Sequence, residues 1–377
     1  MASSIVNKLP WKIQSKFKMR PDGAYKSFAY YNDKFPNNCE IQNIFGEGWS
    51  LLTPPKTWNG IIPHNFHEVL AEKQNKVDIV KLKNCSIYSF DNTYGVITHD
   101  NKVIEDNTFR HESKYNNNHP FLSIQSIPKA KKIKGKALIL AVSGGDTFHW
   151  HWMLDSVPKY GIMELARITE KDFDYIVINE MNLASHKGVL EKLKIPMEKI
   201  IELKNNERLQ FDEISIPTDI RYNEFVIHYL RTRFSPQHNE KASKRLFVSR
   251  NNARWRKIKN EEQIFNFLEK NYGFQKVYFE NMTFEEQAEL ASKTEATFSL
   301  VGSNQVNMVF YPKGGKIIEV QPEGLANVAN WITSEQCKHE YCYFEAKNAD
   351  AKDKEELQYR DVVIDIDRLS ELMKKMF

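Results

Sequence analysis

Residues 137–166 read ALILAVSGGDTFHWHWMLDSVPKYGIMELA and contain an apolar run, a Gly144-Gly145 turn and an aromatic-rich stretch with helical character. A short apolar run that ends at glycines is typical of a buried strand. A helix that follows such a strand is typical of a βαβ unit, and these units build parallel sheets. The stretch therefore predicts an α/β fold.

The alternation of strand-like and helix-like segments continues along the chain. After the opening stretch, strand-like runs occur at 175–178, 200–203 and 214–216, with a helical stretch at 185–193. A second set comprises strands at 246–249, 276–279, 297–301 and 316–320, and helices at 261–271, at 284–293 and after Ser303. Thr283 and Glu286 form a capping-box pattern for one of these helices. The second set predicts a doubly wound sheet of the Rossmann type.

The length of 377 residues suits two domains, or three. We expect residues 1–235 to form an N-terminal lobe, with an irregular α+β part at 1–130 and the βαβ part at 136–235. Short runs at 87–90 and 95–98 predict antiparallel strands in the irregular part. A C-terminal lobe is expected at 240–345, beyond a hinge around 234–242. The amphipathic segment within 350–377 is expected to return as a helix to the first lobe.

Composition narrows the class of protein. The chain is 41% hydrophobic and 27% charged, which is typical of a folded globular protein, and its net charge is +4. That charge is too even to indicate nucleic-acid binding, although it suits an anionic substrate such as a nucleoside diphosphate. The four cysteines form no CxxC pair, so we expect free thiols in a reducing compartment, the cytoplasm.

The N-terminal residues are basic and aromatic, with Lys8, Trp11, Lys12 and Lys16 among them. A segment of this kind can rest on an anionic membrane surface, which would place the protein at the inner face of the membrane. A solvated terminus is the alternative. No window approaches the ~20 apolar residues that a membrane-spanning helix needs.

His151 and Asp155 are the candidate catalytic residues. They stand four residues apart, hence on one face of a helix, just after the glycine turn where a parallel sheet places its site. A carboxylate beside an imidazole fixes its tautomer and raises its basicity, as a general base requires. In the alternative reading the histidines and tryptophans are core aromatics and Asp155 caps a turn. Which of the two is the base stays open, and we identify no metal ligand set.

Several residues could bind an anionic ligand in the second lobe. Arg250 and Arg256 follow the strand at 246–249, and arginine matches phosphate oxygens bidentately, although a solvated basic loop would look the same. A strand-to-helix junction after Val301 could present backbone N–H groups to an anion, and Glu319 at a strand tip could grip a ribose. The junction residues are Gly302, Ser303, Asn304 and Asn307.

In their order and spacing these segments resemble glycosyltransferase family 61. The matching elements are His151-Trp-x-x-Asp155-x-x-Pro158, Ser249-Arg250 with Arg256 and Asn260-Glu261, Phe284-x-Glu286-Gln287, Gly302 with Asn307, Phe310 and Pro312, and Ile318-Glu319-x-x-Pro322. The resemblance extends from about Gly144 to Pro322. One departure is that Val301 stands where the family's loop usually has histidine, and Ser303-Asn304 replace Ala-Gly.

The resemblance implies an enzyme with a GT-B fold, in which two Rossmann-like lobes flank a cleft. It implies inverting transfer of a hexose or pentose from a nucleoside diphosphate sugar, UDP-linked, to a glycan hydroxyl, without an essential metal or other cofactor. Bacterial capsule or surface-polysaccharide synthesis is the context it suggests. The alternative is a non-catalytic nucleotide- or glycan-binding protein on the same fold.

Overall fold

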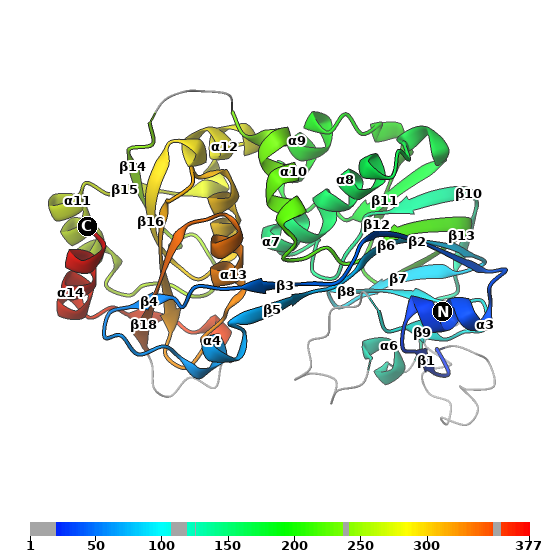
Figure 1. Ribbon diagram of the computed structural model, residues 1–377, viewed down its shortest axis with the longest axis horizontal. Helices are drawn as coiled ribbons and strands as arrows, with labels where there is room; N and C mark the ends of the chain where they lie inside the picture. Colours follow the sequence, from blue (N-terminus) through cyan, green and yellow to red (C-terminus); the bar gives the residue numbers. More distant parts are fainter. Residues whose placement is uncertain (1–19, 107–118, 125, 237–240, 350–355) are drawn as a thin grey trace. The chain divides into compact units, whose positions relative to one another are not determined.

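The computed structural model describes residues 20–106, 119–124, 126–236, 241–349 and 356–377. Within them the chain divides into two compact units. The first extends to Glu47 and continues from Asn75 to Arg221, and the second comprises Gly48–Gln74 and the chain from Tyr222 onward. Each unit is a mixed α/β structure with parallel strands, as the sequence predicts (Figure 1).

The sheet of the first unit joins a parallel half to an antiparallel half. Its order is β1 (Ala24–Tyr25), β9 (Val103–Ile104), β8 (Thr93–Ile97), β7 (Ser86–Phe90), β13 (Glu207–Pro217), β10 (Lys131–Ile139), β11 (Tyr175–Asn179) and β12 (Ile200–Leu203). β13, β10, β11 and β12 run parallel, whereas β7 and β8 are antiparallel, as predicted. β13 also pairs with β6 (Val77–Lys83), which pairs with β2 (Cys39–Phe45). The long strand β13 therefore binds the irregular part and the βαβ part into one core.

Helices accompany the strands of this unit. They are α3 (Phe28–Lys34), α6 (Pro120–Ser123), α7 (His149–His151), η1 (Trp152–Ser156), α8 (Val157–Leu165), η2 (Glu170–Asp172), α9 (Ala184–Lys192) and η3 (Met197–Lys199). In chain order β13 comes last, yet it lies on the opposite side of β10 from β11. The winding reverses between β13 and β10, and open α/β sheets bind ligands at the carboxyl ends of strands at such a switch point.

The second unit has its own parallel sheet. Its order is β15 (Gln275–Val277), β14 (Lys244–Val248), β16 (Thr294–Leu300), β17 (Lys316–Pro322) and β18 (Glu340–Asn348), with β19 (Val362–Val363) antiparallel and β4 (Lys56–Thr57) parallel to β18. The remaining elements are β3 (Gly48–Leu51), α4 (His64–Glu68), β5 (Ala71–Gln74), α10 (Glu224–Phe234), α11 (Glu261–Tyr272), η4 (Phe279–Asn281), α12 (Phe284–Ser292), η5 (Ser303–Phe310), α13 (Ala329–Gln336), η6 (Leu357–Tyr359) and α14 (Ile366–Met376). The winding reverses between β14 and β16, which makes this the second switch point.

Two expectations about the lobes are wrong. The segment Gly48–Gln74 belongs to the second unit, where Trp331 Nε1 donates to the Thr53 carbonyl at 3.0 Å and Phe66 packs on Trp331. The boundary between the units falls at Arg221, ahead of the hinge expected around 234–242. Part of the hinge region, 237–240, lies outside the described residues.

The C-terminal helix α14 packs into the core of its own unit, so the expected return to the first lobe is also wrong. The predicted face is correct: Leu369, Leu372, Met373 and Met376 are buried beside Phe247 and Phe274. The buried face of α14 could be predicted because its apolar residues have helical spacing. Spacing alone does not show which core this face packs against.

Within the described residues, no helix is long and apolar enough to cross a membrane. The basic N-terminal stretch that suggested a membrane surface lies outside them, apart from Arg20.

Candidate active site

The aromatic stretch at the first switch point folds as one continuous helix with a widened turn. α7 passes through the π-helical turn η1 into α8, and the Val157 N–H donates to the carbonyl of Trp152, five residues earlier. Pro158 has no N–H, so the next α-helical bond, to Leu154, could not form. Single π turns inside α-helices are frequent at functional sites, and this one contains Asp155.

Asp155 is held by two partners at the carboxyl ends of β10 and β13. His151 Nδ1 lies 2.7 Å from Asp155 Oδ2. Arg221, just beyond β13, donates through Nε to Oδ1 at 3.0 Å and through Nη2 to Oδ2 at 2.7 Å. The Asp155 side chain is 3% exposed and that of His151 16%. The predicted pair therefore exists, and Arg221 completes it as a triad.

The electrostatics assign different roles to the pair. Burial by itself raises the pKa of Asp155, but the charge of Arg221 and the hydrogen bonds from His151 and Arg221 outweigh it, so the pKa of the carboxyl is lowered. An ionised Asp155 accepts the Nδ1 proton of His151, which places the imidazole lone pair on Nε2. The geometry thus favours His151 as the base and Asp155 as the group that orients it.

The glycine turn sets the position of the imidazole. Gly144 has a φ of 76°, which favours glycine, and a Cβ there would lie 3.0 Å from Cδ2 of His151. A Cβ on Gly145 would lie 2.3 Å from Oδ1 of Asn179. That amide bonds both the N–H and the carbonyl of Val142, at 2.9 and 2.8 Å. Both glycines are therefore required by close packing against side chains at the strand ends.

Lys159 is a buried cation near the triad, and the sequence analysis did not single it out. It is 1% exposed, and its Nζ lies 3.4 Å from the Ala141 carbonyl and 5.8 Å from the centre of the Tyr94 ring. Burial lowers its pKa to about 8, against the opposing charges of Asp219 and Asp155. Its spacing of four residues from Asp155 was the available signal.

Two further histidines near the site are buried as neutral groups. His149 is 6% exposed and His186 0%, and the ring of His186 stacks on Trp152 with centroids 4.2 Å apart. The ring nitrogens of His149 and His186 have no hydrogen-bond partner among the described residues. Burial lowers the pKa of His149 to about 4, and burial with the neighbouring His149 lowers that of His186 to about 3.

These imidazoles predict a loss of stability in acid. Both native pKa values lie below the unfolded value of about 6.5, so the unfolded state takes up the protons first as pH falls. The free energy of unfolding should drop by ~1.4 kcal/mol per pH unit for each imidazole below about pH 6. His186→Phe keeps the stacking, so urea denaturation at a series of pH values should show one such slope removed. An unchanged slope would contradict the neutral state inferred for His186.

In the second unit, two arginines meet at the other switch point. Arg250 follows β14, and Gly302 follows β16, where a Cβ would lie 2.0 Å from Nη1 of Arg250. Arg250 donates to the carbonyls of Arg256 and Trp255, both at 3.4 Å. Among the described residues, neither guanidinium has a carboxylate within ion-pair distance. The structure thus brings together Arg250 and Gly302, two residues that the sequence analysis named separately as candidates.

Burial and mutual repulsion act on this arginine pair. Burial and the charge of Arg256 lower the pKa of Arg250 to about 10, and burial lowers the pKa of Arg256. The Arg256 Nε is buried and has no hydrogen-bond partner within the described part of the chain. Two desolvated cations side by side are costly unless an anion joins them. This arrangement suits a phosphate or pyrophosphate, whose oxygens accept bidentate bonds from guanidinium groups.

Other residues singled out in this unit support the loop. Glu261 accepts from Ser249 Oγ and Asn251 Nδ2, both at 2.8 Å, and so anchors the chain on both sides of Arg250. Asn307 is 1% exposed and donates to Gln287 Oε1 at 3.0 Å, which ties η5 to α12. Asn307 is thus a packing residue in this structure, whereas Ser303 and Asn304 are partly exposed at the start of η5. η5 is a 3₁₀ helix.

Glu319 does not face a ligand. It is 0% exposed, and Gln305 and Asn330 donate to Oε1 at 2.6 Å each. Gln321 donates to Oε2 at 2.8 Å, and the Tyr341 hydroxyl donates to the same oxygen. A carboxylate with these donors on both oxygens has no free edge for a ribose, so we reassign Glu319 to a buried network beneath the site.

A known family is similar to the part of the chain that contains these residues. Residues 149–318 match the family model described as Glycosyltransferase 61. Through this region the chain is similar to glycosyltransferase family 61. The match begins in the His151 helix and includes Arg221, Arg250 and Gly302. A search of curated proteins finds no match.

The match to this family model implies glycosyltransferase activity, with a nucleotide sugar and a glycan acceptor as substrates. The family's motif residues fall into two groups in this structure. His151, Asp155 and Arg250 lie at the switch points, whereas Gln287 and Glu319 hold the scaffold. Arg221 was missed because it belongs to no recognised motif. Its signal was its place just beyond the predicted strand at 214–216.

Proposed function

We propose that this protein is a family 61 glycosyltransferase and that it transfers a sugar, with inversion, from a UDP-linked or other nucleoside diphosphate sugar to a glycan hydroxyl. The second unit binds the donor and the first supplies the base, in the GT-B manner expected from the sequence. The observation that carries the proposal is the pair Arg250 and Arg256. Both guanidiniums are desolvated at the carboxyl ends of parallel strands, and among the described residues the carboxylates that act on them, Glu280 and Glu319, lie beyond ion-pair distance, so a diphosphate would complete their surroundings.

The proposed step is a direct displacement. Nε2 of His151 takes the proton from the acceptor hydroxyl, whose oxygen bonds to the anomeric carbon as the bond to the β-phosphate oxygen breaks. The leaving nucleoside diphosphate takes the bonding electron pair, and Arg250 and Arg256 balance its charge. Asp155 remains ionised and stabilises the imidazolium that forms. Because guanidinium groups serve the leaving group, we propose that no metal or other cofactor is required.

Arg250→Met tests the donor site. Charge-assisted hydrogen bonds contribute about 1.5–3 kcal/mol each, so UDP should bind roughly 10- to 100-fold more weakly. Without bound UDP, Arg250→Met should be at least as stable as the parent protein, because the repulsion between Arg250 and Arg256 disappears. Calorimetric titration with UDP and thermal unfolding give the two readouts.

Arg254→Met is the matched control, because Arg254 is exposed in the same loop and only stacks on Trp255. Equal UDP affinity in parent and Arg250→Met would contradict the donor site. The activity itself is tested by UDP release from a panel of UDP-sugars with and without glycan acceptors, and by the anomeric configuration of the product. Nucleotide binding without transfer or donor hydrolysis would instead favour the non-catalytic binding protein, to which Val301 in the loop also points.

A further inference from the structure

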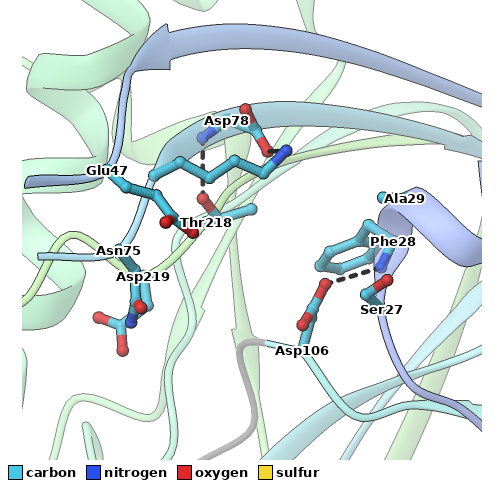
Figure 2. Close-up of a pocket in the computed structure, with 10 residues that line it drawn as sticks. Ser27, Phe28, Ala29, Glu47, Asn75, Asp78, Asp106, Thr218 and Asp219 are labelled. Carbon is cyan, nitrogen blue, oxygen red and sulfur yellow. Dashed lines mark hydrogen bonds and ion pairs between the residues drawn. The ribbon is translucent and has the colours of Figure 1, made fainter. Parts of the chain in front are cut away.

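A polar cavity of about 310 Å³ lies in the first unit, apart from the residues assigned above. Figure 2 shows its walls, which come from five places in the chain: the start of α3, the chain after β2, the chain around the start of β6, the chain after β9, and the loop after β13. The lining residues are Ser27, Phe28, Ala29, Glu47, Asn75, Lys76, Asp78, Asp106, Thr218 and Asp219.

The cavity is lined on one side by the loop that leads to Arg221 of the catalytic triad. Thr218 and Asp219 follow the last residue of β13, on the same edge of the sheet from which β10 leads to His151. Asp219 Oδ1 accepts from the backbone N–H of Arg221 at 3.0 Å. The short loop that forms one side of the cavity therefore also carries the arginine that holds Asp155.

The charge of the lining residues disfavours binding of the nucleoside diphosphate sugar donor. Four carboxylates face one ammonium group, and that ammonium, on Lys76, already pairs with Asp78 at 3.0 Å. Asp78 is further bound by Asn43 at 2.8 Å, and its side chain is only 7% exposed. The remaining carboxylates repel a nucleoside diphosphate, so this cavity and the arginine pair suit ligands of opposite character.

The lining is suited to a ligand with many hydroxyl groups. Ionised carboxylates only accept hydrogen bonds, and sugar hydroxyls donate them. Asp106 and Asp219 offer acceptors, Asn75 and Ser27 offer both functions, and the ring of Phe28 supplies an apolar side (Figure 2). The volume lies at the lower end of that of small-molecule sites, which fits one or two sugar rings.

We infer that this cavity binds a neutral, hydroxyl-rich sugar residue of the acceptor glycan, next to the residue whose hydroxyl reacts at His151. The inference rests on the proposed function, because it assigns an acceptor subsite to that reaction. It also gives Asp219 two roles, as a wall of the subsite and as a support for Arg221.

Asn75→Trp tests the subsite by filling it, because Asn75 is an exposed lining residue. Asp106→Asn removes one charge and keeps an acceptor for the Phe28 N–H, which bonds Asp106 Oδ2 at 2.8 Å. The matched control is Asn37→Trp, at a separate cavity of about 250 Å³ on the same unit. The probes are methyl glycosides of neutral hexoses, pentoses and hexosamines, observed by saturation-transfer NMR.

We expect neutral glycosides to bind the parent and Asn37→Trp, and their signals to fall at least several-fold in Asn75→Trp and more weakly in Asp106→Asn. Undiminished signals in Asn75→Trp, or no neutral glycoside bound by the parent, would overturn the inference. Binding of hexosamines alone would overturn it in favour of a cation site. Glycoside binding needs no transfer, so a parent that binds them without using any donor would defeat the proposed function and leave the subsite standing.

Discussion

Replacing His151 by alanine is expected to lower kcat by ~10²–10⁴-fold, the range typical of a lost general base. The imidazole is oriented through Nδ1 by Asp155 at 2.7 Å, and its side chain is 16% exposed, within reach of an acceptor. UDP affinity should stay within about twofold, because the arginine pair belongs to the other unit. Single-turnover transfer rates and calorimetric titration of UDP measure the two quantities.

His228→Ala is the control for this prediction, because His228 is an exposed histidine on α10 and should be replaceable without effect. Asp155→Asn should also lower kcat, since an amide no longer stabilises the imidazolium. If His151→Ala kept the parent rate while Asp155→Asn lost it, the base would be Asp155. If both variants kept it, the triad would have no part in catalysis.

The second large effect is on stability. Arg221→Met should destabilise the protein by ~3–5 kcal/mol, the cost of removing the cation from a buried ion pair, because Asp155 keeps only its bond with His151. Asp155 is 3% exposed and accepts both bonds of the Arg221 guanidinium, at 3.0 and 2.7 Å. Adding Asp155→Asn to this variant should recover a large part of the loss, because the uncompensated charge disappears. Urea denaturation of the four proteins forms a double-mutant cycle.

Arg233→Met, an exposed arginine on α10, is the control and should change stability by less than about 0.5 kcal/mol. The pH dependence gives a further check. The native pKa of Asp155 is lowered, so the stability from this carboxyl is complete above its unfolded pKa of about 3.9 and is lost as pH falls through the native value. Equal losses in Arg221→Met and the double variant would mean that the charge pairing of Asp155 is not the cause.

The sequence predicted local structure well where a pattern within one segment was sufficient. The capping box at Thr283 and the buried face of α14 are confirmed, and so is the strand Ile200–Leu203. Each depends on residues a few positions apart, whose side chains share a helix face or alternate along a strand. The glycine turn before His151 could be predicted for the same reason.

Contacts between segments that are far apart in the sequence depend on the tertiary structure. Arg221 joins Asp155 from 66 positions along the chain, because β13 lies beside β10. The segment Gly48–Gln74 joins the second unit through contacts with residues beyond 300.

The α/β class, the resemblance to family 61 and the pairing of His151 with Asp155 could be predicted from the sequence, because they depend on local order and spacing. Long-range packing buries Glu319 among donors, and it leaves Arg250 and Arg256 with no carboxylate of the described residues within ion-pair distance. The physical reason is that the charge and hydrogen-bond state of a polar side chain depends on its burial and its partners, and long-range packing sets both.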